Sequence, residues 1–180
     1  MPNGTGRIVV ALALALLGSC SDGAGPDDVL TAEQSDALLA IVGDMLFESS
    51  QAEIGSGGTM SFVVPCLFKG EVDGSGKLTV SPDSSTYSVD LTMVYRKCRQ
   101  GSDVGVFVLD GTVRFTSTDK SDDVAQTRAI DQKLTGALDW SLDKTSGSCE
   151  MDLTITVRAT ATTGNSDLTG SFCGTSFPTS

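Results

Sequence analysis

The feature that most constrains this chain is an alternation of apolar and polar residues with a period of two, which runs from about residue 59 onward. Between Ile130 and Leu142, one face of alternate positions carries Ile130, Leu134, Gly136, Leu138, Trp140 and Leu142, and the other face carries Asp131, Lys133, Thr135 and Asp139. Successive side chains of a β-strand point to opposite faces, so such a segment buries one face and exposes the other. The pattern is typical of an antiparallel sheet with one solvated face.

Seven segments follow this pattern and are predicted to be strands. Short clusters of Gly, Pro, Ser, Asn and Asp separate them and favour turns. Because no connection is long enough for a crossover helix, we expect an up-and-down meander, either a curved sheet or a small barrel. The predicted strands are 60–73, 77–81, 87–95, 111–115, 130–142, 150–159 and 168–172, and the predicted turns are 74–76, 82–84, 100–103, 119–123, 144–148 and 164–165.

One segment before the strands has a helical period instead. Its apolar residues recur at spacings of three and four, at Leu38, Ile41, Val42, Met45 and Leu46. The preceding Thr31-Ala32-Glu33-Gln34 has the pattern of a capping box, which predicts a helix from about Ala32 to Ser49. No Lys or Arg lies between Asp27 and Phe68 to attract anionic lipid. We therefore expect the apolar stripe to pack on the sheet rather than bind a membrane or a partner. The predicted fold class is mainly β, an antiparallel meander with one N-terminal α-helix packed on it.

The first twenty residues have the composition of an export signal. A positive charge at Arg7 precedes ten uncharged residues, 8–17, whose helix would span about 15 Å, half of a bilayer core. The segment is therefore a signal-peptide core and not a membrane span. It ends in Leu17-Gly18-Ser19-Cys20, which resembles the lipobox of bacterial lipoproteins. That resemblance covers about 25 residues and implies that Cys20 is acylated and becomes the new N-terminus.

The residue after Cys20 bears on which membrane holds the protein. In lipoproteins of bacteria with two membranes, Asp directly after the cysteine favours retention in the inner membrane. Ser21 stands there in this chain and Asp appears only at 22, so the resemblance implies an outer-membrane lipid anchor. The expected organisation is a signal peptide at 1–19, a lipid-anchored flexible tether at 20–30, an amphipathic helix at 31–54 and a β domain at 55–180.

Four cysteines remain once Cys20 is set aside, and an even number in an oxidising compartment predicts two disulfides. The absence of any C-x-x-C pair disfavours zinc-ribbon and thioredoxin-like sites. We expect sequential pairing, because each bridge then joins neighbouring strands. The predicted pairs are Cys66 with Cys98 and Cys149 with Cys173.

The predicted turn at Gly164-Asn165 conflicts with the second pair. A two-residue turn there places Ala159 opposite Gly170 and Cys173 opposite Thr156, about 23 Å along the strand from Cys149. Either this turn is longer and the strand bulged, or Cys149 pairs elsewhere.

The sequence contains few residues in patterns typical of catalytic or metal-binding sites. It contains no His, which excludes Ser-His-Asp and Cys-His nucleophiles and His-containing zinc sites. Two S-x-x-K matches begin at Ser117 and Ser141, and we interpret both as solvated residues at strand ends. The carboxylate pairs Glu71 with Asp73 and Asp139 with Asp143 are expected on outward strand faces in contact with water, which does not suit acid/base catalysis.

The acidic cluster of Asp119, Asp122 and Asp123 lacks the D-x-D-x-D-G spacing of a calcium loop and is interpreted as a charged hairpin loop. We therefore expect no enzyme activity, no metal and no cofactor.

The net charge limits which classes of partner the protein can bind. The net charge is −11, and −12 from Cys20 onward, which opposes binding to nucleic acid. We expect a structural or protein-interaction module that is attached to the membrane through acylated Cys20, with an unknown envelope protein as a possible partner. The alternative is a carrier of a small hydrophobic ligand in a lipocalin-like barrel. An enclosed apolar cavity of roughly several hundred Å³ would favour the carrier, and a filled interior would favour the module.

Overall fold

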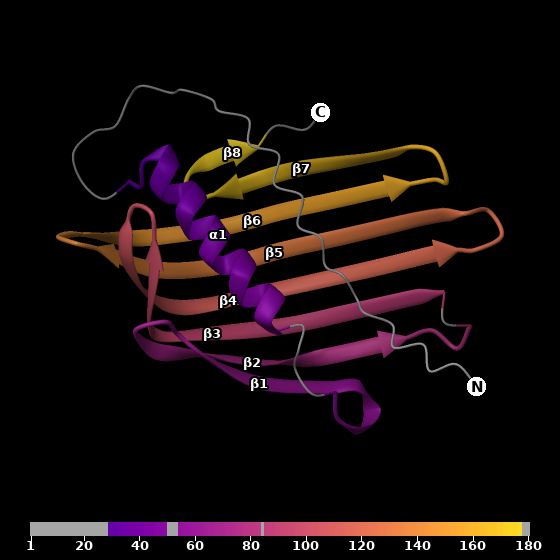
Figure 1. Ribbon diagram of the computed structural model, residues 1–180, viewed down its shortest axis with the longest axis horizontal. Coiled ribbons are helices and arrows are strands. Elements are labelled where there is room, and N and C mark those ends of the chain that lie inside the picture. The colour runs from indigo at the N-terminus through magenta and orange to yellow at the C-terminus, as the bar shows by residue number, and fades with distance from the viewer. Residues whose placement is uncertain (1–28, 50–53, 84, 178–180) are drawn as a thin grey trace.

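The computed structural model describes residues 29–49, 54–83 and 85–177. Eight antiparallel strands pair in sequence order in one curved sheet (Figure 1). The predicted meander is confirmed, and the sheet is open, since β1 and β8 are its two edges. The strands are β1 (Thr59–Pro65), β2 (Lys69–Val80), β3 (Thr86–Ser102), β4 (Gly105–Asp122), β5 (Thr127–Leu142), β6 (Thr145–Ala159), β7 (Gly164–Phe172) and β8 (Thr175–Phe177), with a short 3₁₀ helix, η1 (Ser56–Gly58), before β1.

The helix α1 (Ala32–Ser49) occupies the predicted segment. Its first turn is closed by the predicted capping box: the Thr31 N–H donates to Gln34 Oε1 at 2.9 Å, and the Gln34 N–H donates to Thr31 Oγ1 at 3.2 Å. These two bonds satisfy backbone donors that a helix start otherwise leaves unpaired.

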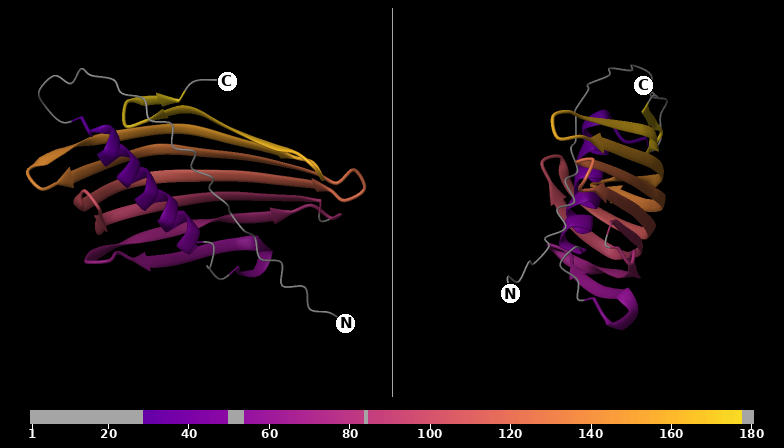
Figure 2. Two further views of the ribbon diagram at one scale, coloured as in Figure 1. Left: turned by 45° about the horizontal axis from the view of Figure 1, so that its top comes forward. Right: turned by 90° about the vertical axis from the view of Figure 1, so that its right-hand side faces the viewer.

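The helix crosses one face of the sheet diagonally, and the sheet curves toward it (Figures 1 and 2). We call this the inner face. Leu38 and Val42 of the helix have no exposed surface, and Met45 is 1% exposed. They belong to one core cluster with sheet residues such as Tyr95 and Phe107. Because this cluster contains residues of both elements, the core lies between the helix and the sheet. Each fully buried side chain of this kind stabilises the fold by about 1.5–3 kcal/mol.

The outer face of the sheet is polar, as the alternation predicts. Among the described residues, this face carries four ion pairs, all between strands that neighbour one another in the sheet. Each of these ion pairs is exposed to solvent, and exposed ion pairs contribute little to the free energy of unfolding. The pairs are Arg96 with Asp73, Arg114 with Asp90, Lys133 with Asp152 and Arg158 with Asp131.

The predicted turn at 74–76 is wrong, because these residues lie inside β2. Gly74 pairs with Phe62 on one side and with Met93 on the other. The Phe62 ring covers Gly74 so closely that a Cβ there would lie 1.9 Å from the ring Cζ. The turn falls instead at residues 66–68, within the segment predicted as one strand. The eighth strand, β8, was not predicted.

The predicted turn at 164–165 is also wrong. Gly164 already pairs with Ala159, and residues 160–163 form the turn, closed by a bond from the Thr160 N–H to the Thr163 carbonyl at 2.7 Å. The longer turn shifts the register so that Phe172 lies opposite Met151. Three other turns are shorter than predicted or displaced and fall at 103–104, 123–126 and 143–144, whereas the predicted turn at 82–84 joins β2 to β3.

Candidate functional site

The predicted lipidation site, Cys20, lies outside the described residues, together with the predicted signal peptide and most of the predicted tether. The first residue that the structure describes is Val29, two residues before the capping Thr31. Within the described ranges, no helix is long and apolar enough to cross a membrane.

Two disulfides join the sequential cysteine pairs. Cys66 and Cys98 have Cα atoms 5.4 Å apart, and the bond ties the β1–β2 turn to β3. Cys149 and Cys173 have Cα atoms 4.3 Å apart, and the bond ties β6 to the turn after β7. The longer β6–β7 turn removes the conflict that the predicted register raised, because the Cys173 N–H now donates to the carbonyl of Glu150.

A bulge in β3 places Cys98 for its bridge. The register against β4 shifts between Tyr95 and Cys98, and Lys97 has a φ of 48°. The extra residue lets Tyr95 and Cys98 both face the core, where neither has exposed surface. Strict alternation predicts opposite faces for these two residues, so the sequence pattern gave no signal of the bulge.

Within the part of the chain that the structure describes, the two candidate catalytic serines are not paired with a general base. Ser117 lies inside β4, not at a strand end as predicted, and Ser141 is the second-last residue of β5. Lys120 and Lys144 are exposed. No hydrogen bond links either serine to its lysine among the described residues.

Carboxylates of the acidic cluster are used within their own hairpin. Asp119 forms an ion pair with Arg128 on the inner face, and hydrogen bonding to Asp119 raises the pKa of the Arg128 guanidinium. Asp122 accepts the N–H groups of Val124 at 3.0 Å and Ala125 at 2.9 Å, which closes the β4–β5 turn. In the described part of the chain, no group of three or more His, Cys, Asp or Glu could hold a metal ion.

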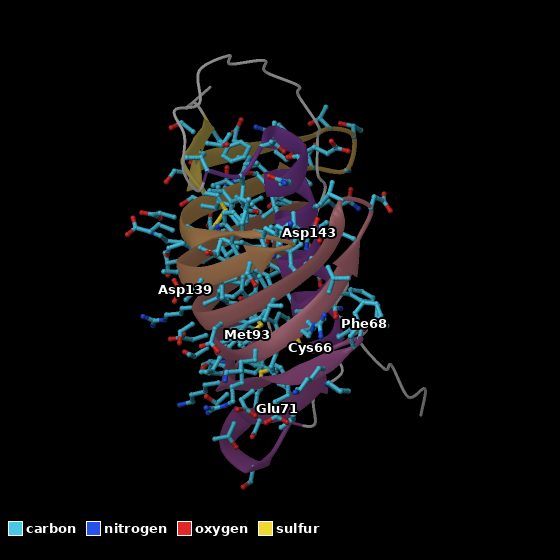
Figure 3. All side chains as sticks on the ribbon, turned by 90° about the vertical axis from the view of Figure 1, so that its left-hand side faces the viewer. Cys66, Phe68, Glu71, Met93, Asp139 and Asp143 are labelled. Atoms are coloured by element: carbon cyan, nitrogen blue, oxygen red, sulfur yellow. A yellow bond between two sulfur atoms is a disulfide. The ribbon has the colours of Figure 1, made fainter. Side chains whose placement is uncertain are left out.

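The other candidate carboxylates lie apart. Asp73 is paired with Arg96. Figure 3 shows Glu71, Asp139 and Asp143 at separate places around the molecule, so they do not converge on one point.

One buried hydroxyl lies beneath the helix. Tyr95 has no exposed surface, and its hydroxyl has no hydrogen-bond partner among the described residues. Desolvation by burial raises the pKa of Tyr95. The group is enclosed in the core, where a ligand has no access.

The helix covers only part of the inner face. Beyond it, toward the β2–β3, β4–β5 and β6–β7 turns, two cross-strand rows of inward side chains continue. Most of their apolar members are half-buried, in contrast to the fully buried residues under the helix. We call these rows the distal inner face; they consist of Val89, Ser117, Gln132, Ile155 and Leu168, then Tyr87, Asp119, Ile130, Val157 and Ser166.

A hollow of about 740 Å³ opens to solvent where the helix begins. It brings the first turn of α1 against the β3–β4 and β5–β6 turns and has a mixed lining of Gln34, Val104, Leu142, Asp143, Lys144 and Thr145. Its open form and charged rim do not suit an apolar ligand.

The edges of the sheet differ in length and composition. β8 has three residues. β1 has seven, Thr-Met-Ser-Phe-Val-Val-Pro, with no charge and with Val63 59% exposed. Natural edge strands are usually short, charged or covered, because their free backbone groups invite pairing with another chain.

Comparison with known proteins identified no relative, since no family model, curated protein or solved structure matches this chain.

Proposed function

We propose that this protein is a lipid-anchored cell-envelope module that binds another protein through the free edge of β1. Two features support a module over a carrier. The space between helix and sheet is filled by side chains such as Leu38, Val42 and Met45. The open hollow by the helix start is not an enclosed apolar cavity.

The uncharged β1 edge is the observation that carries the proposal. Only alternate backbone groups of β1 point away from β2. Along that side, Ile54 bridges Met60 at the start of the strand, Pro65 at its end has no N–H, and the N–H of Val63 lies between them. An extended segment of a partner can add to such an edge, with backbone bonds giving affinity and exposed side chains giving specificity. The partner we propose is therefore an envelope protein with an extended, uncharged segment.

The direction of the free backbone groups follows from one bond. The Gly55 N–H donates to the Thr59 carbonyl at 2.9 Å, on the side of β1 that faces away from β2. Backbone groups of an antiparallel strand alternate between its two sides. The N–H of Val63, four residues later, therefore also points away from β2.

A proline at position 63 tests strand addition. Val63→Pro removes an N–H that the sheet does not use, so the fold is expected to persist. Val63→Thr keeps the N–H and is the matched control. A photo-crosslinking residue at Ser61, in cells, should give an adduct with an envelope protein that Val63→Pro abolishes and Val63→Thr retains.

An adduct that persists in Val63→Pro, or that forms equally from Thr118 in the middle of the outer face, would contradict edge binding. Melting temperatures of the variants confirm that each is folded.

Membrane attachment through Cys20 is part of the same proposal and rests on the lipobox resemblance, which also favours the outer membrane. A Cys20→Ser variant should leave an unprocessed or soluble species, whereas the wild type should partition into detergent. A wild-type protein found wholly in the aqueous phase would contradict the anchor.

The carrier is the second candidate, and the distal inner face favours it. Ile130, Ile155 and Val157 give this face an apolar character that the helix leaves partly uncovered. A carrier would hold an apolar ligand there in stoichiometric amount. Organic extraction of purified Cys20→Ser protein, followed by mass spectrometry, distinguishes the candidates, because the module carries no such ligand.

We also propose that the protein is not an enzyme. A Ser-Lys pair is the mechanism that tolerates the lack of His, and it needs a desolvated lysine. Lys120 and Lys144 are exposed. A fluorophosphonate or a fluorescent penicillin should not label the protein; stoichiometric labelling lost in Ser117→Ala or Ser141→Ala would overturn this proposal.

A further inference from the structure

Two large apolar side chains project from the β1–β2 turn. Leu67 is 67% exposed and Phe68 is 60% exposed. Figure 3 shows Phe68 at the rim of this end of the molecule, beside Cys66 and on the opposite side from Asp139. Exposing adjacent Leu and Phe side chains to water is costly, which suggests that they contact an apolar phase.

The turn holds these side chains outward in a fixed position. The Leu67 N–H donates to Gln100 Oε1 at 2.7 Å, and the Phe68 N–H donates to the Arg99 carbonyl at 3.1 Å. The disulfide of Cys66 fixes the start of the turn. Both side chains lie over Gly101, where a Cβ would be 3.3 Å from Phe68 Cε2 and 3.5 Å from Leu67 Cδ2. Their exposure is therefore built into the fold.

Cations surround this apolar pair, although the chain as a whole is acidic. Lys69 and Arg99 are cross-strand partners, and both are exposed. Lys97 is exposed in the bulge two residues before Arg99. None of the three forms an ion pair within the described ranges, which leaves two like charges directly opposite each other. Such a pair is unfavourable until an anion lies between its members.

The start of the helix, which follows the predicted anchor in the sequence, lies at the same end of the molecule. The hollow lined by Gln34 and Val104 places the start of α1 against the β3–β4 turn, whose neighbour is the β1–β2 turn. Val29, just before the helix, is 65% exposed. Nine residues, 20–28, separate it from Cys20 and span at most about 30 Å when extended. The first described residue, Val29, therefore belongs to the same end of the sheet as the β1–β2 turn.

We infer that this corner, formed by Leu67, Phe68, Lys69, Lys97 and Arg99, docks on the surface of an anionic lipid bilayer. Leu67 and Phe68 enter the interface while the three cations contact lipid phosphates. The inference extends the proposed function, because a lipid anchor at Cys20 supplies the nearby bilayer. It assigns the domain a fixed orientation, with the β4–β5 turn pointing away from the lipid.

The carboxylates at this end limit how the corner docks. Asp103 in the β3–β4 turn and Asp143 in the β5–β6 turn are exposed, and an anionic surface repels both. Glu71 is exposed on β2. The domain must therefore tilt so that the β1–β2 turn meets the lipid first.

A tryptophan at the corner measures docking directly. The full lipidated chain carrying Phe68→Trp is reconstituted in phosphatidylglycerol and phosphatidylethanolamine vesicles with brominated acyl chains, which quench nearby tryptophan. The matched control is Val124→Trp, because Val124 is 97% exposed in the β4–β5 turn at the opposite end. Trp140 stays in both variants as a buried background, 4% exposed. Phe68→Trp should be quenched and blue-shifted, and Val124→Trp should not.

Charge variants test the role of the cations. Each Lys or Arg near an anionic surface favours binding about fivefold, so Lys69→Gln with Arg99→Gln should reduce the ratio of docked to undocked protein about 25-fold. Lys77→Gln with Lys120→Gln makes the same charge change elsewhere and should have no such effect. High salt should weaken docking of the wild type.

Three results would overturn the inference: equal quenching at Phe68→Trp and Val124→Trp, no loss of quenching in the Lys69→Gln, Arg99→Gln variant, or a blue shift that grows with protein concentration and needs no vesicles. The last would show that a second protein copy covers the corner. Flotation of the chain with vesicles reports the anchor separately. Chain that floats without quenching at Phe68→Trp contradicts docking alone, whereas chain that does not float contradicts the proposed anchor.

Discussion

A glycine in the middle of β2 lies under an aromatic ring from the neighbouring strand. Gly74 is buried, and a Cβ at this position would lie 1.9 Å from the Phe62 ring. Gly74→Val should displace the ring and lower the free energy of unfolding by about 1–3 kcal/mol. Ser75→Val, on the exposed face one residue later, should change it by less than about 0.5 kcal/mol. Chemical denaturation of both variants checks this, and equal stability of the two would contradict it.

A second residue-scale prediction concerns pH. Asp83 in the β2–β3 turn accepts hydrogen bonds from the Ser81 hydroxyl and from the N–H and hydroxyl of Ser85. These bonds, that from Ser81 most of all, lower the pKa of Asp83 from 3.8 to about 2. A carboxyl with a lowered folded-state pKa stabilises the fold above its unfolded pKa, and this stabilisation is lost as pH falls through the folded value.

Asp83→Asn removes this dependence. Between pH 4 and pH 2, the melting temperature should fall less in Asp83→Asn than in the wild type, and at pH 7 the variant should be the less stable of the two. Asp123→Asn, in another exposed turn, serves as control. An identical pH profile for Asp83→Asn and the wild type would show that the turn contributes nothing.

Turns predicted from residue types alone were misplaced, because glycine occurs both in turns and inside strands that approach a neighbour closely. Gly74 and Gly76 resemble a turn in composition, yet Gly76 lies inside β2, where a Cβ would be 2.2 Å from the Asp90 carbonyl oxygen. The strand needs glycine there for close approach, not for a bend. The true turn at residues 66–68 lies between Pro65 and Gly70, and the Cys66 N–H donates to the carbonyl of Gly70, which has a φ of 85°. The disulfide of Cys66 with Cys98 also fixes it, and that long-range constraint is not visible in the local sequence.

Elements with a strong local signal were predicted more accurately. The bounds of α1 follow from the capping box at Thr31 and the apolar spacing, both of which act within a few residues. The inner and outer faces of β5 and β6 follow from alternation alone. The register between β6 and β7 depended on the length of one turn, and a four-residue turn at 160–163 replaced the predicted two-residue one.

The helix is predicted to be an integral part of the fold. Ile41 is 4% exposed and belongs to the core cluster that joins α1 to the sheet. Ile41→Asp would bury an unpaired charge and should destabilise the domain by several kcal/mol, at least about 3. Ala40→Asp, on the exposed side of the same helix turn, should cost less than about 1 kcal/mol. An unchanged melting temperature for Ile41→Asp would mean that the helix is detached and free to bind a partner.

At the scale of the whole molecule, the sheet is closed by neither hydrogen bonds nor a second sheet. Its longest strands lie inside the sheet, with 17 residues in β3, 18 in β4 and 16 in β5, and each is paired on both sides. The two disulfides lie toward the opposite edges, one at the β1–β2 turn and one at the β7–β8 turn. The covalent bonds thus reinforce the strands that have the fewest neighbours.

This arrangement predicts that each disulfide controls the local stability of its own edge. A bridge that closes a loop of this size stabilises by about 3 kcal/mol, which corresponds to roughly 100-fold in the rate of amide exchange through local opening. Replacing Cys149 and Cys173 by Ala should accelerate exchange in β7 and β8 by up to about that factor and leave β4 and β5 nearly unchanged. Replacing Cys66 and Cys98 by Ala should instead accelerate exchange in β1 and β2. Hydrogen exchange measured by mass spectrometry tests both variants. Because the central strands are paired on both sides, a uniform acceleration across all strands would mean that the sheet opens only as a whole and that the edges have no separate stability.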